Sequence, residues 1–167
     1  MGLVSPVEAA PVPVSSLLAT APGERDYADC WCCEIAGSAG LSQLIEAFFT
    51  CPAFRPERLT LAAIGKGGSD AEARALAQGE TDRFAAWTLV ERREDEILLE
   101  DFAHRTRCWL AVAPQVGHTR VSFGTAILAR TGDGGADRAE NLAFRALVPF
   151  HRFYARRLIA SAAKRIA

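Results

Sequence analysis

The sequence has almost no net charge and no long hydrophobic run. Nineteen Lys and Arg residues against twenty Asp and Glu residues leave a formal charge of −1. No strong positive field is therefore present to attract a phosphate backbone, and we expect no nucleic acid partner. The apolar windows are short and interrupted by charges or prolines, whereas a membrane span requires roughly 20 continuous apolar residues. We therefore expect no membrane span.

Residues 1–23 contain no Lys or Arg, and four of them are prolines. They have neither the basic start nor the unbroken apolar run of a secretory signal. We interpret them as an extended arm in which a serine caps one helical turn through Leu17 and Leu18. Because prolines remove backbone donors and the apolar residues are scattered, we expect the arm to contribute little to the core. Residues 24–167 are predicted to form a single domain.

The cysteines lack the spacing of a metal site. There are five cysteines, and this odd number suits the reduced thiols of a cytoplasmic protein better than a disulfide framework. Alternation along a strand would place Cys30 and Cys32 on one face and Cys33 on the other, so the three could not converge on one tetrahedral ion without a bulge. We expect free buried thiols, no metal and no cofactor.

Hydrophobic periodicity predicts an α+β fold. Alternation over 26–35 is typical of a strand with a buried face, and apolar residues at helical spacing over 41–49 predict a helix. One or two further short helices follow, the last opened by a capping box of Ser69 and Glu72 and closed by Gly79. Short connections then predict an antiparallel meander of four strands, at 83–92, 97–102, 105–113 and 119–130.

A glycine-rich loop at 131–138 is predicted to lead into a long amphipathic helix over 141–167. About 25 helical residues at ~1.5 Å rise span about 37 Å, enough to cross a sheet of about seven strands. One face of the helix is expected to be buried because apolar residues recur at three- and four-residue steps. This face consists of Phe144, Leu147, Val148, His151, Tyr154, Ala155, Leu158, Ala162 and Ile166.

This order of elements resembles helix-grip domains, the START-like or SRPBCC superfamily, over residues 26–167. The motifs that carry the resemblance are Asp-Tyr-Ala-Asp at 26–29, Leu-Ser-Gln-Leu-Ile-Glu-Ala-Phe-Phe at 41–49 and Pro-Phe-His-Arg at 149–152, which are similar to an uncharacterised bacterial family in that superfamily. The resemblance implies a curved antiparallel sheet wrapped around the final helix, with two or three short helices after the first strand. It also implies an apolar cavity that in relatives holds lipids, sterols, polyketides or other hydrophobic molecules. Members usually have seven strands, so two beyond the five predicted are either missing or hidden in residues 55–80.

The candidate site residues are those expected to face this cavity. His151 could orient a polar group of a ligand or act as an acid or base, since imidazole titrates near neutrality; the alternative is a core histidine bonded to a strand. His104 shares a face with Cys108 by alternation and is the second catalytic candidate, unless it is simply a polar residue at a strand end. The predicted ligand-binding residues are Trp87, Cys108, Trp109, Phe123, Val148, His151 and Tyr154.

Three functions are left open by the sequence. The first is a protein that binds a small hydrophobic molecule in a cavity of about 300 Å³ or more. The second is an enzyme of the cyclase, isomerase or hydrolase kind that uses a cavity histidine. The third is an interaction module with a filled core, whose exposed apolar patch or sheet edge recruits a partner, and a homodimer is also considered.

Overall fold

The computed structural model describes the backbone of residues 2–129 and 136–167 and the side chains of residues 2–129 and 146–167. The elements are β1 (Glu8–Ala9), α1 (Leu17–Thr20), β2 (Arg25–Ala36), α2 (Leu41–Thr50), the 3₁₀ turn η1 (Pro52–Phe54), α3 (Arg55–Ala63), α4 (Asp70–Gln78), β3 (Arg83–Phe84), β4 (Trp87–Arg92), β5 (Glu96–Asp101), β6 (Thr106–Gln115), β7 (His118–Leu128) and α5 (Ala136–Ile166). The predicted α+β class is confirmed. Most of the predicted glycine-rich loop lies outside the described residues.

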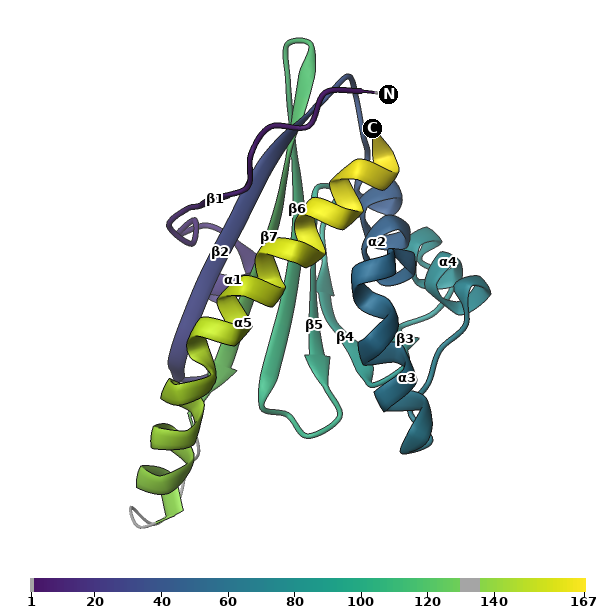
Figure 1. Ribbon diagram of the computed structural model, residues 1–167. Helices are drawn as coiled ribbons and strands as arrows, with labels where there is room; N and C mark the ends of the chain where they lie inside the picture. The colour runs from purple at the N-terminus through teal and green to yellow at the C-terminus, as the bar shows by residue number, and fades with distance from the viewer. Residues whose placement is uncertain (1, 130–135) are drawn as a thin grey trace.

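The described strands form one antiparallel sheet of seven strands in the order β1-β2-β7-β6-β5-β4-β3 (Figure 1). Neighbouring pairs from β4 to β7 confirm the predicted meander. The two additional strands are not hidden in residues 55–80, which form α3 and α4. One is β1, in the N-terminal arm. The other arises because residues 83–92 divide into β3 and β4 at Ala85, where a φ of 51° turns the chain.

Helices α2 and α5 pack next to each other on one face of the sheet, which we call the inner face, and α4 packs against α2 (Figure 1). The apolar side of α2 buries Phe48 and Phe49. Their rings contact Phe54 of η1, with centroids 5.9 and 5.2 Å away. Phe48 also lies against Phe123 of β7, with centroids 4.8 Å apart. This aromatic cluster positions the start of α3, which follows η1 directly.

The C-terminal half of α5 lies across the sheet, whereas its first turns extend past the end of β2 (Figure 1). Ala155, Leu158 and Ala162 are buried, as the periodicity predicted. Leu147 is exposed, so the prediction of burial was wrong there, because the helix has left the sheet at that point. The side chain of Phe144 lies outside the described residues. Within the described part of the chain, no helix combines the length and apolarity needed to cross a bilayer.

The N-terminal arm is part of the fold. Its strand β1 pairs with β2, and α1 covers the outer face of the sheet, where Leu17 and Leu18 are fully buried. Gly124 of β7 provides the space for α1, because a Cβ at this position would lie 2.7 Å from Cδ2 of Leu18. The capped helical turn was predicted correctly, since Oγ of Ser16 accepts a hydrogen bond from the N–H of Ala19. The expectation that the arm contributes little to the core was wrong, because two apolar residues in isolation give no periodic signal.

Candidate functional site

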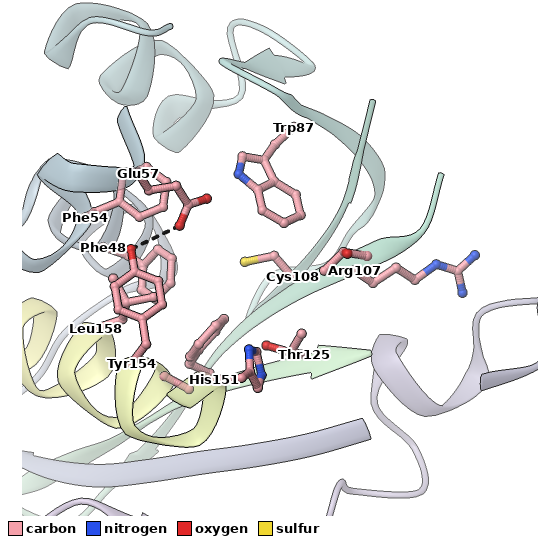
Figure 2. A pocket seen from close by; sticks show the side chains of 13 residues that line it. Phe48, Phe54, Glu57, Trp87, Arg107, Cys108, Thr125, His151, Tyr154 and Leu158 are labelled. Carbon is pink, nitrogen blue, oxygen red and sulfur yellow. Dashed lines mark hydrogen bonds between the residues drawn. The ribbon is translucent and has the colours of Figure 1, made fainter. Parts of the chain in front are cut away.

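A pocket of about 150 Å³ lies between α5, the inner face of the sheet and the start of α3 (Figure 2). Its apolar walls are formed by Phe48, Phe54, Trp87, Phe123, Ala155 and Leu158. Polar side chains from four elements also reach it: Glu57 of α3, Cys108 of β6, Thr125 of β7, and His151 and Tyr154 of α5. The pocket therefore combines a largely aromatic wall with a few polar groups, which is the usual composition of a small-molecule site.

The pocket is smaller than the sequence led us to expect. Sites for drug-sized ligands usually have ~300–1,000 Å³, whereas a cavity of about 150 Å³ holds a molecule the size of benzene. Phe48, Phe54 and Phe123 occupy much of the space between helix and sheet, and each of them is buried. A molecule of about six or seven heavy atoms, or one end of a longer molecule, matches the available volume.

Glu57 brings a carboxyl group to the pocket. Glu57 lies in the first turn of α3, directly after Pro56, and the helix dipole favours an acidic residue there. The hydroxyl of Tyr154 donates a hydrogen bond to Oε2 of Glu57 at 3.1 Å (Figure 2). Burial raises the pKa of Glu57, and the hydrogen bond from Tyr154 partly opposes this rise. The carboxyl group is therefore easier to protonate than an exposed one.

The indole N–H of Trp87 is the second donor near this carboxyl group. It is close enough to favour the charged form of Glu57, and so to lower its pKa slightly. Nε1 of Trp87 is nevertheless buried without a hydrogen bond of normal geometry. A hydrogen bond weakens steeply as its geometry departs from the ideal, so this N–H contributes little to the hydrogen bonding of Glu57. Trp87 therefore keeps a free donor in the pocket wall.

His151 reaches the pocket from α5 and has an acidic residue behind it. Its Nε2 lies 3.4 Å from Oδ2 of Asp29, without a hydrogen bond of normal geometry. The same oxygen accepts hydrogen bonds from the hydroxyl of Tyr27 at 2.7 Å and from Nε1 of Trp31 at 3.2 Å. Burial alone would raise the pKa of Asp29, but His151 and Tyr27 outweigh it and hold the pKa below its ordinary value. Asp29 is therefore an anion that lies beside the imidazole of His151.

The structure brings five of the predicted ligand-binding residues to the pocket: Trp87, Cys108, Phe123, His151 and Tyr154. Trp109 is on the outer face instead, where it packs with Leu17 and Leu18, because it alternates with Cys108 along β6. Val148 is half-buried on α5 one turn before His151 and does not line the pocket.

His104 does not reach the pocket, which corrects the prediction that it shares a face with Cys108. It lies in the turn before β6, where its φ of 55° takes it out of the strand alternation. Its side chain is 80% exposed, and Nδ1 is 2.6 Å from Oε1 of Glu100. The alternative interpretation, a polar residue at a strand end, describes its position.

Two acidic residues at or near the pocket, Asp29 and Glu57, were not among the predicted site residues. The position of Asp29 could have been predicted from strand alternation, because Asp29 is a polar residue on the face that also carries Tyr27 and Trp31. The role of Glu57 could not have been predicted from the sequence. A glutamate in the first turn of a helix is ordinary, and its neighbour Tyr154 is 97 residues away in the chain.

The thiols of the described residues behave as small apolar groups. Burial raises the pKa of Cys108, which lines the pocket, and raises that of Cys33 to about 11. Cys30 packs on the outer face and Cys33 on the inner face, which confirms the predicted alternation. Within residues 2–129 and 146–167, no three His, Cys, Asp or Glu side chains are placed to hold a metal ion.

The fold and site define an α+β protein with a seven-stranded antiparallel sheet, a long C-terminal helix and a small pocket between them. No family model, no curated protein and no solved structure matches the chain.

Proposed function

We propose that this protein is a helix-grip domain that binds a small, mostly apolar molecule between its sheet and C-terminal helix. The observation that carries the proposal is the pocket itself, which has aromatic walls and polar groups gathered from α3 and α5. Such a pocket provides apolar area for affinity and a few donors and acceptors for orientation. The element order and the motifs at 26–29, 41–49 and 149–152 support the same proposal.

The pocket volume sets the size of the molecule. About 150 Å³ accommodates a six- or seven-atom ring or branched chain. A lipid, sterol or polyketide would therefore place only one end of its structure here, with the remainder outside the pocket or in space opened by movement of α3 or α5.

Binding is tested by NMR titration of labelled protein with benzene and cyclohexanol. We expect changes in amide shifts around Phe123, Thr125 and Ala155. Cys108→Phe, which fills the pocket from β6, should abolish them, while Cys30→Ala, on the other face of the sheet, should leave them intact. Melting temperatures establish that both variants fold. Shift changes scattered over the surface, or unchanged in Cys108→Phe, would contradict the proposal.

Acid–base catalysis is the second candidate function. The observation that favours it is the position of His151 in the pocket wall, with the carboxylate of Asp29 3.4 Å behind it, because histidine is the side chain that most often transfers protons in enzymes. A pocket histidine of this kind could move a proton between two carbon atoms of a carbonyl compound, as isomerases and cyclases require. Exchange of the α-hydrogens of cyclohexanone in heavy water provides the test. Exchange faster than in buffer, and lost in His151→Leu, supports catalysis, whereas identical rates in both proteins leave binding as the function.

A further inference from the structure

Glu57 has no positively charged partner among the described side chains. On the same helix, Arg58 is engaged elsewhere, since it donates to the carbonyl oxygen of Gly68 and pairs with Asp70. Arg107 borders the pocket, but its guanidinium points away from it in Figure 2 and Nε donates to Glu100 at 3.0 Å. Tyr154, which donates a hydrogen bond to Glu57, and Trp87, whose N–H lies near it, are both neutral. A carboxylate that is partly removed from water is normally paired with a cation, and none of the described side chains supplies one to Glu57.

The balance of charge around the pocket is negative. Among the described titratable side chains, Glu57 and His151 are directed to it, Arg107 borders it but points away, and Asp29 lies behind His151 at 3.4 Å (Figure 2). If His151 is in its protonated, positively charged form, Asp29 compensates its charge, and the negative charge of Glu57 remains without a partner. If His151 is neutral, the carboxylate of Glu57 is still without a cation. In either state a positively charged occupant is favoured over a negative one.

The walls of the pocket also suit a cation. The rings of Trp87 and Tyr154 lie next to the carboxyl group of Glu57 in Figure 2, and Phe54 and Phe123 border the same space. The faces of aromatic rings carry negative potential and attract ammonium groups, most strongly where water is excluded. A carboxylate beside aromatic rings is therefore complementary to a cation that carries an apolar body.

We infer that the occupant of this pocket is an organic ammonium ion of about six or seven heavy atoms, whose charged nitrogen lies against Glu57 and whose apolar body lies against the aromatic wall. The inference rests on the proposed binding function and names the chemical class of the ligand. The ammonium group supplies the missing partner of Glu57 and donates hydrogen bonds to it, while Tyr154 keeps its own. A neutral ligand of the same shape leaves the carboxyl group unpaired.

Three probes of nearly equal shape test the inference by calorimetry or NMR titration: cyclohexylammonium, cyclohexanol and cyclohexanecarboxylate. At about pH 8 a simple alkylamine is protonated, and ionisation of Glu57 is favoured relative to acidic solution. We expect cyclohexylammonium to bind at least about tenfold more tightly than cyclohexanol, and the carboxylate to bind most weakly. This comparison in the unaltered protein is sufficient to overturn the inference, even if a variant fails to fold.

Two variants then test whether the charge of Glu57 causes the preference for the ammonium probe. Glu57→Gln keeps shape and an acceptor for Tyr154, and we expect it to bind cyclohexylammonium and cyclohexanol equally. Glu34→Gln is the matched control, because Glu34 pairs with Arg120 on the surface of β2, away from the pocket. It should keep the full preference, which excludes an effect of overall charge.

The outcomes separate the two proposals. Equal or tighter binding of cyclohexanol by the unaltered protein overturns the ammonium assignment and leaves the binding function standing. A preference for ammonium that persists in Glu57→Gln also overturns it. Failure of all three probes and of benzene to bind overturns both.

Discussion

The indole Nε1 of Trp109 donates a hydrogen bond to Oε2 of Glu96 at 2.6 Å, and both residues are buried on the outer face of the sheet. The same oxygen accepts a hydrogen bond at 2.8 Å from the backbone N–H of Leu17, at the start of α1. Oε1 of Glu96 pairs with Arg93. One carboxylate thus accepts hydrogen bonds both from a backbone N–H at the start of a helix and from a buried indole. The N-terminal arm is consequently fastened to the middle of the meander.

Leu18→Ala should lower the free energy of unfolding by about 2–5 kcal/mol, because a fully buried leucine leaves a cavity under α1. Leu3→Ala is the matched control in the same arm, where Leu3 is 84% exposed, and its effect should stay within about 0.5 kcal/mol. Urea unfolding measures both. Two equally small effects would show that the arm does not contribute to the core in solution.

Gly124→Ala should destabilise the fold by about 1–3 kcal/mol through overpacking. The new Cβ would lie 2.7 Å from Cδ2 of Leu18 and 3.0 Å from the backbone oxygen of Asp29. In the double variant with Leu18→Ala, the clash with Leu18 disappears, so the total loss should be smaller than the sum of the single losses. Strictly additive losses would assign the strain to the Trp109 ring of β6 and the backbone of β2 rather than to α1.

Glu57→Gln should raise the stability of the unliganded protein at neutral pH. Because the folded-state pKa of Glu57 is raised by burial, the folded protein binds a proton more tightly than the unfolded chain. Its contribution to stability is therefore fully present below the unfolded pKa of about 4.3 and is lost as pH rises through the folded pKa. The gain from the variant should be larger at about pH 7 than at about pH 4. A variant less stable than the parent at both pH values would mean that the carboxyl group supports the fold.

Asp29→Asn should remove part of the stability that the protein has at neutral pH. The folded-state pKa of Asp29 is lowered, so its contribution is present above the unfolded pKa of about 3.9 and is lost as pH falls through the folded pKa. Asparagine still offers an oxygen to Tyr27 and Trp31, so the change isolates the charge. Unfolding curves from about pH 3 to pH 7 should converge at the acidic end. A constant difference across this range would indicate lost packing instead of lost ionisation.

The variant His151→Leu can be measured alongside Asp29→Asn over the same pH range. Nε2 of His151 makes no hydrogen bond of normal geometry, so His151→Leu should cost less than about 1 kcal/mol at neutral pH. It should also shift the acid limb of the stability profile to higher pH, because Asp29 loses a neighbour that lowers its pKa. A loss of several kcal/mol would instead identify His151 as a structural residue of the core.

Predictions from local sequence patterns were correct wherever the structure of an element depends mainly on interactions within that element. The strand at 26–35, the helix at 41–49, the capping box of Ser69 with Glu72 and the Gly79 terminus all follow from periodicity and capping. Alternation alone also placed Cys30 and Cys33 on opposite faces. The same rule, applied to Trp109, would have excluded it from the pocket.

Sequence patterns therefore predict the fold class, the order of the elements and the buried side of most of them. Tertiary structure decided which residues meet: Leu17 with Glu96, 79 residues apart, and Tyr154 with Glu57, 97 residues apart. It also decided the pocket volume, because three phenylalanines from α2, η1 and β7 converge between helix and sheet. The physical reason is that propensity and capping act within a few residues, whereas contacts between distant elements depend on the packing of the whole core.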